Sequence, residues 1–211
     1  DWVKAVQVSE SLEKFSDNRL EVQVAHYLCE LSVIKIENKN VEKALVYLEE
    51  ALVKNPLCVR ASILKGDIYK YSGNREAAIS SWRSIEQQEP SYLSLVASRV
   101  LDAYNDLNIV DEGLELLQRY LRTYPSFDML SAVFCGYMEH GYVESANRIL
   151  RNTIREDSNL LVLKMFLQTG VSESDTESKR DLLLFHQILQ KNINNLELYN
   201  CKNCGFKAKV L

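Results

Sequence analysis

Residues 44–56 read ALVYLEEALVKNP, and residues 78–90 read AISSWRSIEQQEP. The two segments repeat each other at a constant offset of 34 positions, which aligns Ala44 with Ala78, Leu48 with Trp82, Ala51 with Ile85 and Pro56 with Pro90. A small residue, a large apolar residue four positions later and a closing proline favour a helix that ends at the proline. A repeat of this length predicts stacked helical hairpins.

The period of 34 residues is that of the tetratricopeptide repeat. In that repeat, small residues stand where the two helices cross, and large apolar residues stand where the next repeat packs. Gly66 and Tyr69 fit a first helix, and Ala78 and Trp82 fit the second helix of the same unit. The later units are looser, and the same roles fall to Tyr104, Gly113, Leu117 and Pro125, and then to Tyr137, Ala146 and Leu150. The sequence therefore predicts an all-α tetratricopeptide-repeat solenoid, a right-handed superhelix.

The repeat phase divides the chain into segments. Residues 1–24 are predicted to hold the second helix of a truncated repeat plus a linker, from Trp2, Ala5, Val8 and Leu12. Residues 25–159 hold four repeats, placed at 25–58, 59–92, 93–126 and 127–159. Residues 160–196 hold a helix pair near 160–169 and 179–192, and residues 197–211 form a metal knuckle.

Composition and charge narrow the class of function. Hydrophobic residues make up 46% of the 211 and charged residues 26%, which is typical of a folded soluble domain. The net charge of −4 argues against nonspecific binding to nucleic acid or to an anionic membrane. No stretch approaches the roughly 18 apolar residues of a membrane span. Because the chain opens within a helical pattern, we interpret it as a piece of a longer protein.

A cysteine pair near the C-terminus is the most specific chemical motif. Cys201 and Cys204 are followed by Gly205 and Phe206. Two thiolates at this spacing can face one ion, and structural zinc takes four tetrahedral ligands, so the pair is half of a metal site. Two alternatives stay open. The first is a thioredoxin-like redox pair, which belongs in a βαβ context that a helical array lacks. The second is a pair of surface thiols that bind no ligand.

The other cysteines and the histidines indicate no catalytic centre. Cys29, Cys58 and Cys135 fall in apolar helical patterns and are interpreted as small buried residues, and their odd spread favours a reducing compartment. A nucleophilic pair of His26 and Cys29 lacks an orienting third group. His140 falls in a predicted turn and His186 in an amphipathic helix, where both serve packing or the surface. We expect no enzyme.

Three stretches of the chain resemble a known family. Residues 1–5 read DWVKA, residues 25–31 read AHYLCEL, and residues 199–206 read YNCKNCGF. With the repeats between them, they are similar to the lipopolysaccharide assembly protein B family of Gram-negative bacteria. The resemblance implies an N-terminal inner-membrane helix, repeats on the cytoplasmic side and a rubredoxin-like metal domain with two knuckles. Cys201 and Cys204 match the first knuckle. The other two ligands of a zinc or iron ion would follow Leu211, and the helix at 179–192 is expected to cover this domain.

The resemblance also implies a function and partners. The family is a non-enzymatic adaptor that promotes proteolysis of the deacetylase committing cells to lipid A synthesis (LpxC) by the membrane AAA+ protease FtsH. It answers to an inner-membrane regulator that senses lipopolysaccharide. No nucleic acid is expected. The alternative from the residues alone is a zinc-ribbon protein that binds nucleic acid on a helical scaffold, which requires a basic continuation past Leu211.

Overall fold

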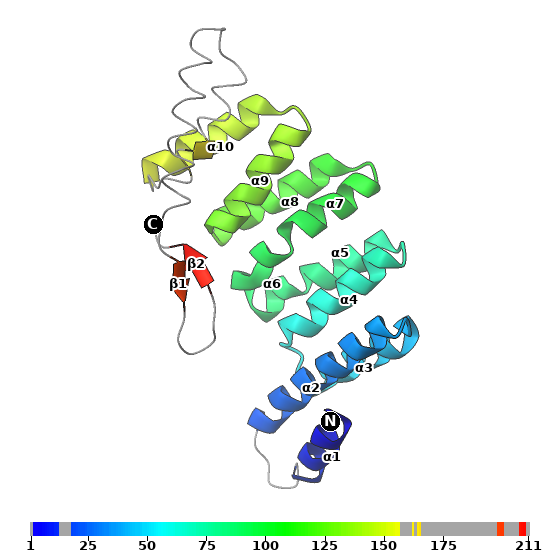
Figure 1. Ribbon diagram of the computed structural model, residues 1–211. Coiled ribbons are helices and arrows are strands. Elements are labelled where there is room, and N and C mark those ends of the chain that lie inside the picture. Colours follow the sequence, from blue (N-terminus) through cyan, green and yellow to red (C-terminus); the bar gives the residue numbers. More distant parts are fainter. Residues whose placement is uncertain are drawn as a thin grey trace. The chain divides into compact units, whose positions relative to one another are not determined.

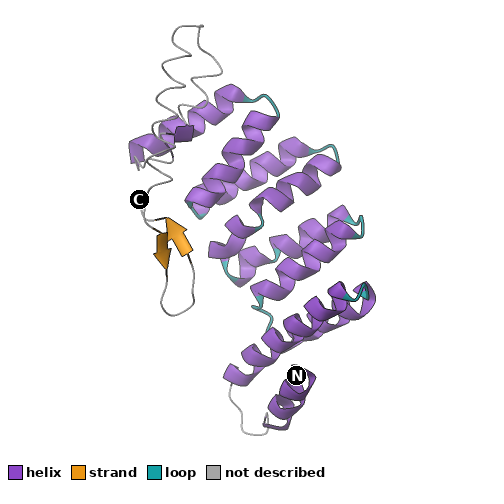
Figure 2. Cartoon of the chain, in the orientation of Figure 1, coloured by secondary structure: helices purple, strands orange, loops and turns teal. Residues whose placement is uncertain are grey.

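The computed structural model describes residues 2–12, 18–156, 162, 164–165, 198–200 and 207–209. By its internal contacts the chain divides into unit 1, residues 1–133, and unit 2, residues 134–211. In unit 1 successive helices fold back on each other as hairpins joined by short turns (Figures 1 and 2). This is the arrangement that the 34-residue period predicts, and the all-α repeat fold is confirmed.

The elements of unit 1 are α1 (Trp2–Leu12), α2 (Asn18–Glu37), α3 (Val41–Lys54), α4 (Val59–Tyr71), α5 (Arg75–Arg83), α6 (Ile85–Gln88), the 3₁₀ helix η2 (Pro90–Leu95), α7 (Ala97–Asp106) and α8 (Val110–Thr123). Helix α9 (Phe127–Glu139) crosses the boundary between the units. Unit 2 continues with α10 (Val143–Glu156) and the strands β1 (Leu198–Asn200) and β2 (Lys207–Lys209).

The turns that join α2 to α3, α4 to α5, α7 to α8 and α9 to α10 each contain one residue in the left-handed backbone region. The φ angles are +58° at Lys39, +85° at Gly73, +58° at Asn108 and +77° at Gly141. These positions recur at nearly the repeat period, so these four hairpins reverse direction through the same backbone conformation. Glycine and asparagine tolerate this conformation well, whereas Lys39 adopts it at a steric cost.

Asparagine begins the second helix in the first two hairpins. The side-chain oxygen of Asn40 accepts a hydrogen bond from the amide of Lys43 at 3.1 Å. Asn74, 34 positions later, accepts one from the amide of Ala77 at the same distance. Each side chain satisfies an amide that the helix itself leaves without an acceptor.

The core of unit 1 lies between the helices of each hairpin and between neighbouring hairpins. Leu48 and Trp82, which the repeat offset aligns, are both fully buried. A Cβ atom on Gly66 would lie 2.2 Å from Nε1 of Trp82, and a Cβ on Gly113 would lie 2.8 Å from Cβ of Tyr104. The small residues that the repeat pattern requires therefore stand where α4 meets α5 and where α7 meets α8.

Helix boundaries differ from the predicted repeat phase in two places. Helix α2 begins at Asn18, seven positions before residue 25, and its added turns bury Val24. The second helix of the next hairpin is interrupted at Ser84, whose Oγ donates a hydrogen bond to the carbonyl of Ser81 at 2.7 Å. Such a side-chain bond competes with the helical ladder. The chain then continues as α6 and η2 before α7 begins.

Unit 2 is described only in part. Its hairpin places Tyr137 and Tyr142 edge to face, with ring centroids 6.1 Å apart, and buries Ala146 and Leu150 fully. The strands β1 and β2 form an antiparallel pair with Tyr199 opposite Ala208. The predicted helix pair at 160–169 and 179–192 lies outside the described residues, except for helical residues 162, 164 and 165. None of the described helices combines the length and apolar character needed to cross a membrane.

Candidate partner-binding surface

Ion pairs join the first helices of consecutive hairpins in unit 1. Three pairs link α2 to α4 and α4 to α7, and we call their six residues the charge ladder: Glu30 with Arg60 at 2.7 Å, Asp67 with Arg99 at 2.9 Å, and Lys70 with Asp102 at 2.7 Å. Their side chains are about one third to two thirds exposed, so solvent and a ligand can both reach them. The ladder therefore forms a polar surface along α2, α4 and α7.

Two further ion pairs flank the ladder. Arg75, at the start of α5, binds Asp106 at 2.6 Å and also donates to the carbonyl of Lys70 at 2.7 Å. Lys65 of α4 lies 3.4 Å from Glu49 of α3. Exposed pairs of this kind contribute only about 0–1 kcal/mol each to stability, so their value is in positioning side chains.

Asp67 and Arg99 form the central pair of the ladder. Burial raises the pKa of the Asp67 carboxyl above its usual range, although the Arg99 guanidinium, bound to both carboxylate oxygens, works in the opposite direction. Arg99 is thereby held across the gap between α4 and α7. One guanidinium nitrogen, Nη1, donates to both carboxylate oxygens, at 3.1 and 2.9 Å, and such a charge-assisted contact orients the Arg99 side chain.

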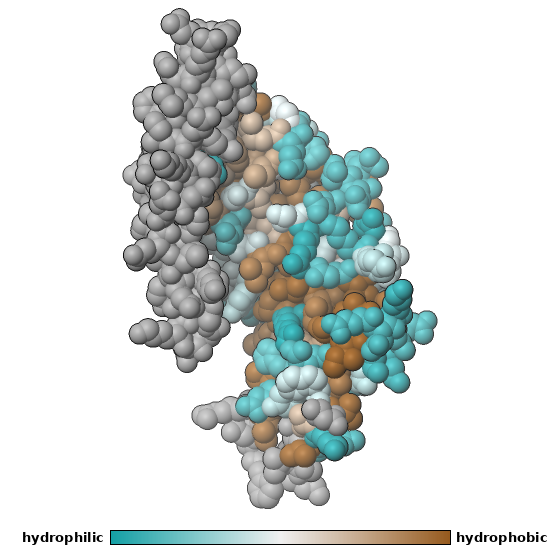
Figure 3. Space-filling view, viewed as in Figure 1, coloured by the Kyte–Doolittle hydropathy of each residue, from teal (hydrophilic) through white to brown (hydrophobic). Residues whose placement is uncertain are grey.

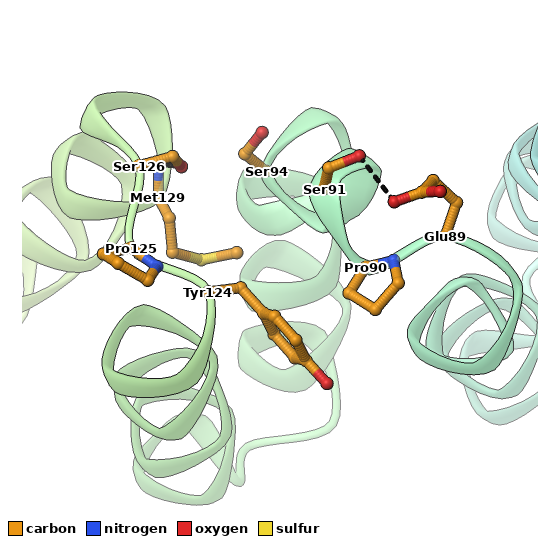
Figure 4. Close-up of a pocket in the computed structure, with 8 residues that line it drawn as sticks. All are labelled: Glu89, Pro90, Ser91, Ser94, Tyr124, Pro125, Ser126 and Met129. Atoms are coloured by element: carbon orange, nitrogen blue, oxygen red, sulfur yellow. Dashed lines mark hydrogen bonds between the residues drawn. The ribbon is translucent and has the colours of Figure 1, made fainter.

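A pocket lies at another edge of the hairpins, where successive repeats connect (Figure 4). It has a volume of about 390 Å³ and is lined by Glu89, Pro90, Ser91, Ser94, Tyr124, Pro125, Ser126 and Met129. Ser91 donates a hydrogen bond to Glu89 at 3.0 Å across its rim. The pocket presents proline, tyrosine and methionine surface, and no cationic or thiol group lines it.

The wider surface of unit 1 mixes polar and apolar side chains. Figure 3 shows hydrophilic residues gathered over the hairpin turns, with apolar residues visible between them. The large apolar residues with the greatest exposure include Tyr71 at 88%, Val53 at 80% and Leu57 at 62%. Scattered exposure of this kind is normal for a soluble protein, so the charge ladder is the better-defined feature.

The predicted metal ligands, Cys201 and Cys204, lie outside the described residues. Immediately before and after residues 201–206 stand β1 and β2, which pair with Asn200 opposite Lys207. The sequence did not predict these strands, since three residues are too few to show an alternating pattern. In the part of the chain that the structure describes, no group of three or more candidate metal-ligating side chains comes together.

The three cysteines that precede the predicted metal motif differ in exposure. Cys29 and Cys58 are buried as predicted, but Cys135 is exposed on α9, and the prediction that it is buried was wrong. The adjacent Phe134 and the next-but-one Tyr137 take the buried positions of that helix. His26 is exposed, whereas Cys29 one turn later is buried against Cys58. His140 is partly exposed in its turn, and His186 lies outside the described residues.

Sequence reasoning missed the charge ladder, although a signal for it exists. The paired residues are separated by 30 positions in the first pair and by 32 in the other two. Because equivalent helices of neighbouring repeats align at 34 positions, a separation two to four positions shorter marks side chains that meet diagonally. A search for opposite charges at this separation would have included them among its candidates, and the coordinates show which pairs meet.

Solved structures with a similar fold identify the fold class of this chain. BtubC from P. vanneervenii matches 100% of this chain and 96% of its own, with a TM-score of 0.61 and 11% identity. MamA matches 84% of this chain and 97% of its own, with a TM-score of 0.53 and 13% identity. YrrB, a tetratricopeptide-repeat protein with an unusual peptide-binding site, matches 90% and 93%, with a TM-score of 0.51 and 15% identity. The chain is an all-α array of tetratricopeptide repeats.

The sequence is also similar to curated proteins of one name. Over its whole length the chain is similar to lipopolysaccharide assembly protein B, with 26% identity to the protein of Haemophilus influenzae and 21% to that of Escherichia coli strain K12. It spans 53% and 54% of those two proteins, about half their length. No family profile matches the chain.

Proposed function

We propose that this chain is the partner-binding part of a non-enzymatic adaptor that controls lipopolysaccharide synthesis at the bacterial inner membrane, from its cytoplasmic side. The observation that carries the proposal is the whole-length similarity to lipopolysaccharide assembly protein B in two bacteria. In this proposal the adaptor brings the deacetylase that commits cells to lipid A synthesis to a membrane AAA+ protease. An inner-membrane regulator that senses lipopolysaccharide would adjust this delivery.

An adaptor works by raising the effective concentration of a substrate at its protease. It needs a surface that recognises a partner, and it needs no reactive group. The charge ladder offers such a surface, because paired side chains hold their positions and can exchange an internal partner for a group on a ligand. A ligand must compete with those internal pairs, which favours a partner of matching shape over any molecule of opposite charge.

The same pairing disfavours the nucleic-acid alternative. Binding to a phosphate backbone requires several unpaired cations in a basic stripe. All the ladder cations have carboxylate partners, and the net charge of the chain is −4. The ladder therefore fits a polypeptide segment that carries both signs of charge.

We further propose that Cys201 and Cys204 supply two thiolates to a structural zinc or iron site, with the other two ligands in the continuing protein. The antiparallel pairing of β1 with β2 supports this, because it brings the two ends of the cysteine segment together. Such an ion would stabilise a small domain rather than take part in catalysis. Four-thiolate sites accept either metal.

The experiment is the half-life of the deacetylase after protein synthesis is stopped, in cells with the intact protein or with the protein depleted. We expect depletion to lengthen the half-life severalfold. Lys70→Ala with Arg99→Ala should lengthen it as well, whereas Arg119→Ala with Arg122→Ala on α8 should not. Thermal unfolding of both double variants controls for folding.

An unchanged half-life on depletion would overturn the adaptor proposal. A normal half-life with the Lys70 and Arg99 variant would remove the charge ladder from partner binding and leave the adaptor role intact. Cys201→Ser with Cys204→Ser tests the metal site separately, by the metal content of the purified full-length protein and by the same half-life.

A further inference from the structure

Two buried cysteines of unit 1 face each other across the joint between its first two hairpins. Cys29 lies on α2 and Cys58 immediately precedes α4, and their Sγ atoms are 3.9 Å apart. Their exposed fractions are 0% and 3%. A single buried cysteine usually serves only to fill space. Two in direct contact, 29 positions apart in the chain, are placed to form a bond.

The surroundings distinguish the two sulfurs. Cys58 occupies the N-cap position of α4, where the helix dipole favours negative charge. The hydrogen bond with Cys29, the amide of Ala61 and the charges of His26 and Arg60 together outweigh the effect of burial and lower the pKa of Cys58 to about 6. That same hydrogen bond, together with burial, raises the pKa of Cys29. The opposite shifts favour Cys58 as the thiolate and Cys29 as the protonated thiol of the pair.

We propose that Cys29 and Cys58 are a redox modification site, which hydrogen peroxide converts to a reversible intramolecular disulfide. In the first step the Cys58 thiolate attacks peroxide. An S–O bond forms, the O–O bond breaks, and the released hydroxide takes up a proton to become water. In the second step the sulfur of Cys29 attacks the sulfenic acid on Cys58. The S–S bond forms, the S–O bond breaks, and the leaving hydroxide takes the Cys29 proton. Two thiols are oxidised, and one peroxide is reduced to two waters.

The geometry requires only a small movement. A disulfide joins its sulfurs at about 2.05 Å, so the two Sγ atoms must approach by roughly 2 Å. Helices α2 and α4 are already in contact, so the approach does not have to bring separated elements together. Both thiols are buried, so peroxide reaches them only when the protein opens locally, and the connection between α3 and α4, where Leu57 is 62% exposed, is the nearest surface in the chain.

The bond would act on the charge ladder. Glu30 adjoins Cys29 in the chain and Arg60 lies two positions after Cys58, and these two residues form the first ion pair of the ladder at 2.7 Å. A covalent link behind that pair would fix the spacing of α2 and α4. Oxidation would therefore hold one end of the proposed partner-binding surface in a single geometry, and reduction would release it.

The test uses the purified full-length protein, in native buffer, treated with hydrogen peroxide. Remaining thiols are blocked by alkylation, the protein is digested, and linked peptides are identified by mass spectrometry. We expect a peptide pair joined through Cys29 and Cys58 in most molecules, lost after dithiothreitol. Cys135→Ser, which removes an exposed thiol, is the matched control and should not reduce the linkage.

Single variants test the order of attack. With Cys29→Ser, the sulfenic acid on Cys58 has no partner and should be captured by dimedone. With Cys58→Ser, Cys29 should remain unlabelled. Oxidation of Cys135 without any Cys29–Cys58 linkage in the native protein would overturn the proposal. So would a linkage that forms only in urea, and labelling of Cys29 in the second variant would overturn the assigned order.

Discussion

At the scale of the residue, Gly66 stands at a position that has no room for a Cβ atom. The indole of Trp82 fills the space where a Cβ would stand, and this indole is fully buried. Its Nε1 donates a hydrogen bond to the carbonyl of Ile63 at 3.3 Å, which fixes the plane of the ring. Glycine is therefore required for close approach, in a helix where alanine would otherwise be favoured by about 1 kcal/mol.

We predict that Gly66→Ala lowers the free energy of unfolding by about 1–3 kcal/mol, because the ring must shift within a packed core. Denaturant unfolding of purified protein measures this, with the exposed Ser80→Ala on α5 as the control. In a Trp82→Phe background the same alanine should cost less, since the smaller ring leaves room. Equal costs in the two backgrounds would show that the indole is not the obstacle.

Tyr120 is a second residue whose surroundings determine a measurable property. The residue is 2% exposed, and its hydroxyl donates a hydrogen bond to Glu86 at 2.9 Å. Burial, followed by this carboxylate, raises the pKa of Tyr120 to about 12. An unfolded tyrosine ionises near pH 10. Between these values the unfolded chain loses the proton while the folded chain retains it.

The sign of the pH dependence follows from that difference. The contribution of Tyr120 is fully present below about pH 10 and is lost as pH rises to about 12, by up to about 3 kcal/mol. Denaturant unfolding at pH 8 to 12 should show wild type losing more stability than Tyr120→Phe, although the variant starts lower for lack of the hydrogen bond. Parallel pH curves for the two proteins would contradict this prediction.

At the scale of the element, the repeat period explains the helices better than local propensity does. The sequence predicted the hairpins from Ala44, Trp82 and their aligned partners, because the packing of neighbours imposes the same residue types at each turn of the array. It failed to predict the break at Ser84, where the serine hydroxyl makes hydrogen bonds with the carbonyl of Ser81 and the hydroxyl of Ser62. The meeting of Cys29 with Cys58 was also missed, since a 29-residue separation does not follow the period.

The helix caps provide a prediction at this scale. Asn40→Ala and Asn74→Ala should each lower the free energy of unfolding by about 1 kcal/mol, because each removes the acceptor for one helix amide. Asn40→Asp and Asn74→Asp keep that acceptor and serve as matched controls in the same unfolding measurement. If alanine and aspartate variants had equal stability at either site, the cap would contribute nothing there.

At the scale of the whole molecule, unit 1 has contacts mainly between elements that are near in the sequence. Helix α2 packs on α3, α3 on α4, α4 on α5 and α5 on α7. In such an array each hairpin depends on its own packing and on its immediate neighbours. The sequence could predict this order from the repeat alone, whereas the candidate site required coordinates, because the ladder depends on the diagonal register of α2, α4 and α7.

This linear arrangement predicts which helices lose stability when one of them is perturbed. Gly66→Ala perturbs the contact between α4 and α5, so native-state hydrogen exchange should accelerate most in those two helices. Helices α3 and α7, which contact them directly, should lose less protection, and α8, one contact further, should lose least. Comparing exchange rates of wild type and variant, helix by helix, measures this gradient. An equal loss of protection in all these helices would mean that unit 1 opens as one cooperative block. In that case a partner bound on the charge ladder would stabilise every hairpin equally, whereas a gradient would confine its effect to the hairpins it touches.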